Sequence, residues 1–395
     1  MISCGHRSSI EKARDMSSRE EKKEITASVL EYLARVPDPR IERTRDHPLV
    51  NVLAIALLAV LCGADSFTAM EEFGECKREF LEKILDLTNG IPSHDTFGRV
   101  FAALVPETLQ EVFRQWIGAL AQVTKGEVVA IDGKTLRRSF RDAGNKAFVH
   151  MVSAWATHNR VVLGQFKTEE KSNEITAIPK LLELLQIKGA VVTIDAMGCQ
   201  KDIAAKIVDG GADYMLAVKD NQPTLRADIQ AAFARATADE RPVDSKDFFQ
   251  TKDEAHGRIE VRRCRTCHDL DSISRQADWA NLACLVMVEV ERTVEGKTST
   301  EQRYYISSQK RLRAKDALAT VRAHWGIENR LHWVLDVAFL EDDCRVRAGH
   351  AAENFAVLRH FTLNLLKKAK SKVGIKIRRQ RAGWDNGFML EVLCG

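Results

Sequence analysis

The sequence predicts a mixed α/β protein that begins with an all-helical region. Between about Ile25 and Gln122, apolar residues recur three or four positions apart, which is the period of an amphipathic helix. From Gly126 onward the pattern changes to short runs rich in β-branched residues that alternate with helical segments. This alternation predicts a mixed sheet with helices packed on its faces.

Turn-forming sequences separate the predicted helices of the first region. The longest apolar run, Val50 to Cys62, is shorter than the roughly 20 residues that a membrane span needs, so it predicts a buried helix and no membrane segment. Further helices are predicted at residues 80–87 and 108–120. Another is predicted to begin after Ser93, a residue type that is typical of an N-cap.

The α/β region contains two short apolar strands that each end on an aspartate. The strands are predicted at residues 127–132 and 190–195, with a hairpin and the helix 174–185 between them. Between about Asn221 and Tyr305 the alternation stops and β-rich segments dominate, which predicts an insertion. The predicted parts are a disordered segment 1–24, a helical domain 25–125, an α/β core 126–220 and 306–366, the insertion 221–305 and a basic tail 367–395.

The predicted tail is the most strongly charged part of the chain. The formal net charge of +4 does not by itself indicate a nucleic-acid partner, but residues 367–381 include eight basic residues and no acidic one. Such a block can bind phosphates non-specifically by releasing counterions. The alternative is a solvated tail that binds nothing. Nine cysteines, an odd number, and an N-terminal segment without an apolar core favour a reducing, cytoplasmic location.

The two strand-end aspartates, Asp132 and Asp195, are the main candidates for a metal site. Carboxyl ends of buried strands lie at the edge of the sheet where ligands of such folds bind, and small residues follow both aspartates. Each aspartate, taken alone, also fits the N-cap of a following turn. A pair of carboxylates suits hard divalent cations.

Glu328 is the third candidate carboxylate. It lies in a predicted amphipathic helix. His324 and His332, four residues to either side, share the helix face of Glu328. A surface glutamate that pairs with Arg322 or Arg330 is the alternative. Asp336, Asp342, Asp343 and Glu260 are rival ligands.

Long motifs that contain these residues resemble those of DDE transposases of bacterial insertion sequences, in the ISAs-type branch that includes the H-repeat-associated proteins. The similarity extends over nearly the whole chain. The motifs include N-G-I-P-S-H-D-T-F-G-R-V-F, A-I-D-G-K-T-L-R-R-S, T-I-D-A-M-G-C-Q, Y-M-L-A-V-K-D-N-Q-P, H-G-R-I-E-V-R and H-W-G-I-E-N-R-L-H-W-V-L-D-V-A-F-L-E-D-D.

The resemblance implies a ribonuclease-H-like core with a DDE triad at Asp132, Asp195 and Glu328, and an N-terminal domain that binds DNA. It also implies two Mg²⁺ or Mn²⁺ ions per active site, cleavage of insertion-sequence ends, and strand transfer into target DNA. The implied partner is double-stranded DNA, with a dimer on DNA in the nucleoid of a bacterial cytoplasm. A nuclease that does not join strands and an inactive, transposon-derived DNA-binding protein remain alternatives.

One departure from many relatives concerns the residues around the glutamate. Where those transposases have tyrosine, arginine and lysine, this chain has Val321, His324 and Leu335. Other cations must therefore contact DNA. The candidate DNA-binding residues are Lys134, Arg137, Arg138, Lys219, His256, Arg258, Arg262, Arg322, His324 and Arg330.

Overall fold

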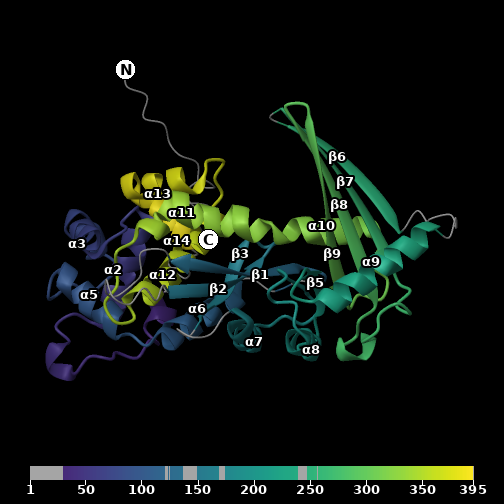
Figure 1. The fold of residues 1–395 in the computed structure, drawn as a ribbon. Helices are drawn as coiled ribbons and strands as arrows, with labels where there is room; N and C mark the ends of the chain where they lie inside the picture. The colour runs from purple at the N-terminus through teal and green to yellow at the C-terminus, as the bar shows by residue number, and fades with distance from the viewer. Residues whose placement is uncertain are drawn as a thin grey trace, which may run out of the picture. The chain divides into compact units, whose positions relative to one another are not determined.

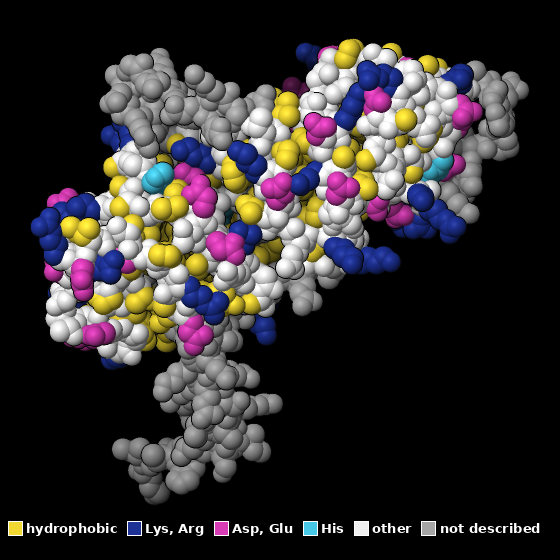
Figure 2. Space-filling view, turned by 90° about the horizontal axis from the view of Figure 1, so that it is seen from below, with side chains coloured by type: hydrophobic (Ala, Val, Ile, Leu, Met, Phe, Trp, Pro, Cys, Tyr) yellow, Lys and Arg dark blue, Asp and Glu magenta, His cyan; other side chains and the backbone are white. Residues whose placement is uncertain are grey.

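The computed structural model describes residues 30–120, 123, 125–136, 149–168, 174–238, 247–255 and 257–394. Their contacts divide the chain into two compact units. The helical unit comprises Met1–Leu120, Leu136–Val149 and Val334–Gly395, and the sheet unit comprises Ala121–Thr135 and His150–Trp333. On the face drawn in Figure 2, Lys and Arg side chains are interspersed with Asp and Glu, in keeping with the nearly balanced composition.

The helical unit is built around two buried helices. All residues of α2 (Leu49–Leu61) except Val50 are buried, as are all residues of α12 (Ala351–Lys368) except the two final lysines. The other helices described in this unit are α3 (Phe67–Cys76), α4 (Arg78–Leu81), α5 (His94–Ala103), α6 (Pro106–Leu120), α13 (Ile375–Trp384) and α14 (Asn386–Cys394), with α11 (Trp333–Phe339) at its boundary. Among the described residues, the segment Glu42–Leu61 alone is long and apolar enough to resemble a membrane span, and 67% of its apolar window is buried inside the protein.

Two local predictions for this unit have different outcomes. Ser93 caps α5 as predicted, because its Oγ accepts a hydrogen bond from the Thr96 amide at 3.3 Å. The helix predicted at residues 80–87 is wrong beyond α4. Asp86 instead accepts a hydrogen bond from the Thr88 amide, and its carbonyl accepts one from the Asn51 side chain. These local bonds satisfy the backbone in a turn and compete with the helix.

The basic segment after residue 366 folds into helices rather than forming a solvated tail. In α13, Arg379 is 3% exposed, and its guanidinium donates to the Val60 carbonyl at 2.7 Å and to the Asp65 carboxylate at 3.0 Å. It also donates to the Ala338 carbonyl and lies over the Phe339 ring. One member of the basic run is thus a structural residue of the helical unit.

The sheet unit contains one nine-stranded mixed sheet in the order β3-β2-β1-β4-β5-β9-β8-β7-β6. Its helices are α7 (Glu174–Leu184), α8 (Lys201–Asp209), α9 (Pro223–Ala238) and α10 (Ala314–His324). Figure 1 shows α7 and α8 on one face and α10 on the other. The strands are β1 (Val128–Leu136), β2 (Val149–Ala156), β3 (Val161–Lys167), β4 (Val191–Ile194), β5 (Asp213–Val218), β6 (Phe248–Ala255), β7 (Arg258–Cys267), β8 (Cys284–Val294) and β9 (Lys297–Ser307).

Strands β6 to β9 extend the same sheet, in the segment predicted as a β-rich insertion. Strand β9 pairs antiparallel with β5, and the four strands form the long ribbon in Figure 1. At its tip, β8 and β9 pair up to Val294 and Lys297. The two residues between them, Glu295 and Gly296, both have positive φ angles (49° and 75°), as a two-residue hairpin turn requires.

The register of the parallel strands brings the two predicted aspartates to the same edge. Strand β1 pairs with β4 up to Ile131 and Ile194, so Asp132 and Asp195 are the first residues beyond the paired stretch. Strand β4 ends there, as predicted, whereas β1 continues to Leu136. The prediction that both strands end on an aspartate is therefore wrong for β1.

Candidate active site

Three carboxylates from three elements of the sheet unit line one open cavity of about 250 Å³. Asp132 lies on β1, Asp195 follows β4, and Glu328 begins a π-helical turn, Glu328–His332, that lies two residues after Gly326 and leads into α11. π-helical turns are rare in proteins, and those that occur are frequently found at functional sites. All three carboxylates predicted from the sequence are thus brought together.

Asp195 caps the turn that follows β4, which is the alternative role that its sequence position suggested, and it also lines the cavity. Its Oδ1 accepts hydrogen bonds from the amides of Met197 at 3.0 Å and Gly198 at 3.3 Å, which hold the turn after β4. A Cβ atom at Gly198 would lie 2.3 Å from a methyl carbon of Ile194, so only glycine fits. The turn therefore fixes the orientation of the Asp195 carboxylate toward the cavity.

Asp132, Glu328 and His332 form a compact cluster of potential ligands. His332 Nδ1 lies 3.7 Å from Asp132 Oδ2 and 3.6 Å from Glu328 Oε2. One potential ligand atom from each of the three residues lies within 4.8 Å of the others. Glu328 is the most exposed of the three and His332 is buried. This set of one nitrogen and two carboxylates can hold a divalent cation.

The two carboxylates of the cluster have pKa values that are shifted in opposite directions, so one carboxylate is charged more readily than the other. Burial, together with a hydrogen bond to Glu328 and its charge, raises the pKa of Asp132 to about 8. The nearby His332 imidazole lowers the pKa of the more exposed Glu328 to about 2. Without a cation, the pair holds a proton on Asp132 near neutral pH. A divalent ion would take the place of that proton, which fits carboxylate metal ligands.

Further cavity residues supply a histidine, cations and an aromatic ring. His324 Nδ1 lies 3.0 Å from Thr193 Oγ1, and burial lowers the pKa of this imidazole, which favours its neutral form. Lys219 and Arg303 line the same cavity. Arg303 lies over the ring of Trp325, 5.2 Å from its centroid, and Trp325 is 46% exposed. The cavity thus combines carboxylates with cations and a partly exposed aromatic side chain.

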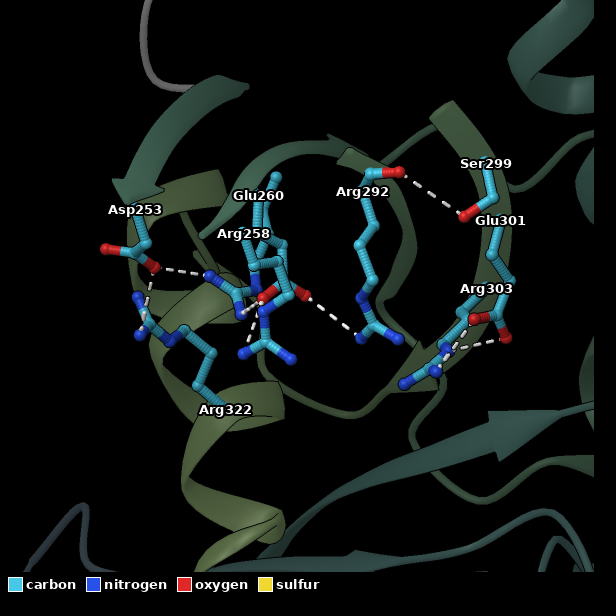
Figure 3. A network of polar contacts seen from close by, with 9 residues as sticks. Asp253, Arg258, Glu260, Arg292, Ser299, Glu301, Arg303 and Arg322 are labelled. Carbon is cyan, nitrogen blue, oxygen red and sulfur yellow. Dashed lines mark hydrogen bonds and ion pairs between the residues drawn. The ribbon is translucent and has the colours of Figure 1, made fainter. Parts of the chain in front are cut away.

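The other predicted DNA-binding residues fall into separate groups. Lys134 is close enough to lower the pKa of Glu328, and Arg330 is exposed on the π-helical turn. Arg258, Arg262 and Arg322 belong to a separate network on β6, β7 and α10, shown in Figure 3. Arg137, Arg138 and His256 lie outside the described residues.

Glu260 is the centre of the network in Figure 3. It is 5% exposed and pairs with Arg262 at 2.7 Å, Arg292 at 3.3 Å and Arg258 at 3.5 Å. This surrounding of guanidinium groups explains its burial and makes it unsuitable as a rival metal ligand. The other rivals, Asp336, Asp342 and Asp343, belong to the helical unit.

A second polar cluster lies beside Asp132, and no motif in the sequence indicated it. Thr135 Oγ1 lies 2.8 Å from His150 Nδ1, and His150 Nε2 lies 2.7 Å from Glu174 Oε1. The Glu174 charge also raises the pKa of Asp132. A Cβ atom at Gly133 would lie 2.2 Å from Glu174 Oε1 and 2.4 Å from His150 Nε2, so these side chains pack directly on the backbone that carries Asp132.

Gly133→Ala is therefore expected to disturb the site much more than the fold. The added methyl group forces the His150–Glu174 pair or the backbone at Asp132 to move, and displacement of a catalytic group by about 1 Å can cost roughly 10²-fold in rate. The measurement is the DNA cleavage rate beside a thermal melt. Gly118→Ala is the matched control, because a Cβ atom at this position would have no neighbour within 4 Å and alanine favours a helix. Equal cleavage rates for both variants would contradict the expectation.

Comparisons with known proteins identify the family of the chain. Residues 124–365 match the family described as Transposase DDE domain, and residues 30–117 match the family described as DDE_Tnp_1-associated. The protein named "H repeat-associated putative transposase YhhI" of Escherichia coli K12 is 39% identical over 373 residues, which cover 93% of this chain and 98% of that protein. The protein named "Putative transposase YncI" of Escherichia coli O157:H7 is 42% identical over 376 residues, which cover 93% of this chain and 94% of that protein.

A solved structure of a piggyBac transposase synaptic complex with hairpin DNA is also similar, with a TM-score of 0.40 and 11% identity over 92% of this chain and 78% of that one. A likeness this distant defines neither fold nor function. The sequence matches, in contrast, cover most of the chain and confirm the resemblance described above. The chain belongs to the transposase family that is defined by the DDE domain.

Proposed function

We propose that the protein cleaves DNA at the ends of an insertion sequence and joins the freed 3′ ends to target DNA, with Asp132, Asp195 and Glu328 as the catalytic carboxylates. The observation that carries the proposal is the convergence of these three side chains, from β1, β4 and the π-helical turn, on one open cavity. Carboxylate clusters of this kind hold the paired divalent ions of phosphoryl-transfer enzymes.

The strand arrangement supports a ribonuclease-H-like core. Five adjacent strands have the order β3-β2-β1-β4-β5, in which β1, β4 and β5 are parallel and β2 pairs antiparallel with β3. Parallel strands place their carboxyl ends at one edge of the sheet, where ligands bind. The proposed active site lies at that edge.

The residues of the cavity have distinct proposed tasks. Asp132, Asp195 and Glu328 would hold two Mg²⁺ or Mn²⁺ ions, which when bound stabilise the charge that develops on the transferring phosphate. Lys219, Arg303 and Lys134 would bind the flanking phosphates, since Lys219 and Arg303 line the cavity and Lys134 lies close to Glu328. The exposed face of Trp325 offers a surface on which a base can stack.

The network of Figure 3 is proposed as a second DNA contact. Arg258 and Arg292, which pair with the buried Glu260, have side-chain exposures of 49% and 48%. Arg322 is equally exposed and pairs with Asp253. A buried carboxylate that pairs with several guanidinium groups fixes their positions and leaves their remaining donors for phosphates. We further infer that the N-terminal helical region binds DNA. We also infer that the protein acts as a dimer on DNA, because transposition requires that the two ends of the element are held together.

Cation binding is expected to depend on pH in a defined direction. Asp132 has a pKa of about 8 and must lose its proton to bind a divalent ion. The affinity for Mg²⁺ should therefore rise by up to about tenfold per pH unit from pH 6 to 8 and level off above pH 8. Calorimetric titration in two buffers of different ionisation enthalpy should show about one proton released per ion at pH 7. Binding that is independent of pH over this range would contradict the shared-proton account.

The proposed function is tested with a plasmid that carries the gene and its chromosomal flanks. Incubation with purified protein and Mg²⁺ should give cuts at the element ends and then joined products, and EDTA should abolish both. Cuts without joined products would favour the nuclease, and binding without cuts would favour an inactive DNA-binding protein. Either result would overturn the proposal.

A further inference from the structure

We propose that His332 is a third ligand, through Nδ1, of the cation that Asp132 and Glu328 hold, and that this nitrogen makes the site prefer Mn²⁺ to Mg²⁺. The inference rests on the proposed function only in taking Asp132 and Glu328 as ligands of a divalent ion. A triad of three carboxylates does not require this histidine.

The π-helical turn directs both side chains to the same place. Glu328 and His332 are the first and last residues of the turn, four positions apart, and share one face of the helix. Opposite them lies Asp132 on β1. Two elements that are distant in sequence thus present one nitrogen and two carboxylates to one point.

The distances fit a shared ion better than hydrogen bonds. His332 Nδ1 is 3.7 Å from Asp132 Oδ2 and 3.6 Å from Glu328 Oε2. Nitrogen and oxygen atoms that share a proton lie about 2.7–3.2 Å apart. Two atoms that each lie about 2.1 Å from one ion are about 3.0–4.2 Å apart, depending on the angle between them. Both distances fall within the second range.

Burial gives a second, independent reason. His332 is 4% exposed, and its Nε2 atom has no hydrogen-bond partner among the described residues. A buried imidazole that only filled space would be less favourable than an apolar side chain, because polar atoms lose their bonds to water. Coordination by Nδ1 would offset the loss of solvation at that nitrogen.

The donor set determines which ion is favoured. Mg²⁺ binds oxygen ligands almost exclusively, whereas transition ions accept imidazole nitrogen. Among ions that suit carboxylate-rich sites, Mn²⁺ accepts such a mixed set. An asparagine at position 332 would replace the nitrogen ligand with an amide oxygen of similar reach, so it should weaken Mn²⁺ binding more than Mg²⁺ binding.

The test is pulsed electron paramagnetic resonance of one equivalent of Mn²⁺ bound to the full-length protein without DNA. The wild type should show electron spin-echo modulation from a directly bound ¹⁴N nucleus, and His332→Asn should lose it. The Kd for Mn²⁺ should rise at least about tenfold in this variant, whereas the Kd for Mg²⁺ should rise less. The ratio of the Kd for Mg²⁺ to the Kd for Mn²⁺, which measures the preference for Mn²⁺, should therefore become smaller than in the wild type. Circular dichroism of the metal-free variant checks its fold.

His324→Asn and His150→Asn are the matched controls, since both histidines lie near the carboxylates and both have a hydrogen-bond partner. Both controls should keep the ¹⁴N signal, which assigns it to His332 even if His332→Asn fails to fold. A wild type without ¹⁴N modulation, or loss of the signal in either control, would overturn the inference. These outcomes are independent of DNA cleavage, so the proposed function can fail or stand separately.

Discussion

Replacing Asp132 with asparagine is expected to slow Mg²⁺-dependent cleavage of DNA at the element ends by about 10³-fold or more. Asparagine keeps the size of the side chain and removes its negative charge, so the proposed divalent ion would lose the carboxylate ligand that β1 contributes to the site. Metal stabilisation of the transition state contributes several kcal/mol, and each 1.4 kcal/mol corresponds to a factor of about ten in rate. The measurement is the initial rate of cleavage of the plasmid with gene and flanks.

Asp209→Asn is the matched control for this prediction. Asp209 is the exposed last residue of α8, and removal of a negative charge at a helix C-terminus is neutral or slightly stabilising. This variant should cleave DNA at the wild-type rate. A folded Asp132→Asn protein with a cleavage rate within about threefold of that control would show that Asp132 is not a metal ligand in the reaction.

Replacing Arg379 with methionine should lower the free energy of unfolding of the helical unit by about 3–5 kcal/mol. Methionine retains much of the packing against Phe339, but the carbonyl oxygens of Val60 and Ala338 lose their donor and Asp65 loses its partner. Buried acceptors without a partner cost about 1–3 kcal/mol each. Chemical denaturation followed by circular dichroism measures the change.

Lys376→Met on the same helix separates this effect from the loss of a positive charge. Lys376 is exposed on α13, and surface substitutions of this type usually change stability by less than about 0.5 kcal/mol. If the two variants unfold at the same denaturant concentration, Arg379 is not the anchor that fixes α13.

The convergence of Asp132 and Asp195 was predictable because it depends on two local facts. Each aspartate follows a short run of β-branched residues, and parallel strands joined through a helix bring their carboxyl ends to one edge. Glu328 was a candidate because His324 and His332 share its predicted helix face, but only the family motif distinguished it from a surface glutamate that pairs with a neighbouring arginine.

The polar surroundings of the site were not predictable. Glu174 contacts the Gly133 backbone from the start of α7, and nothing in its neighbouring sequence indicates which way that helix end faces. Arg379 looked like one cation in a solvated run because its partners are mainly carbonyl oxygens, which every residue carries. Tertiary contacts between backbone atoms and distant side chains have no signature in the pattern of residue types.

The most direct test of the central claim uses a short duplex that ends in the pre-cleaved terminus of the element, supplied with a target plasmid and Mg²⁺. A terminus with a 3′-hydroxyl should join to the plasmid, and an otherwise identical dideoxy terminus should not, because the 3′-oxygen is the proposed nucleophile. Asp132→Asn should join neither. Equal amounts of joined product with both termini, or plasmid degradation without joining to the 3′-hydroxyl end, would contradict strand transfer by this site.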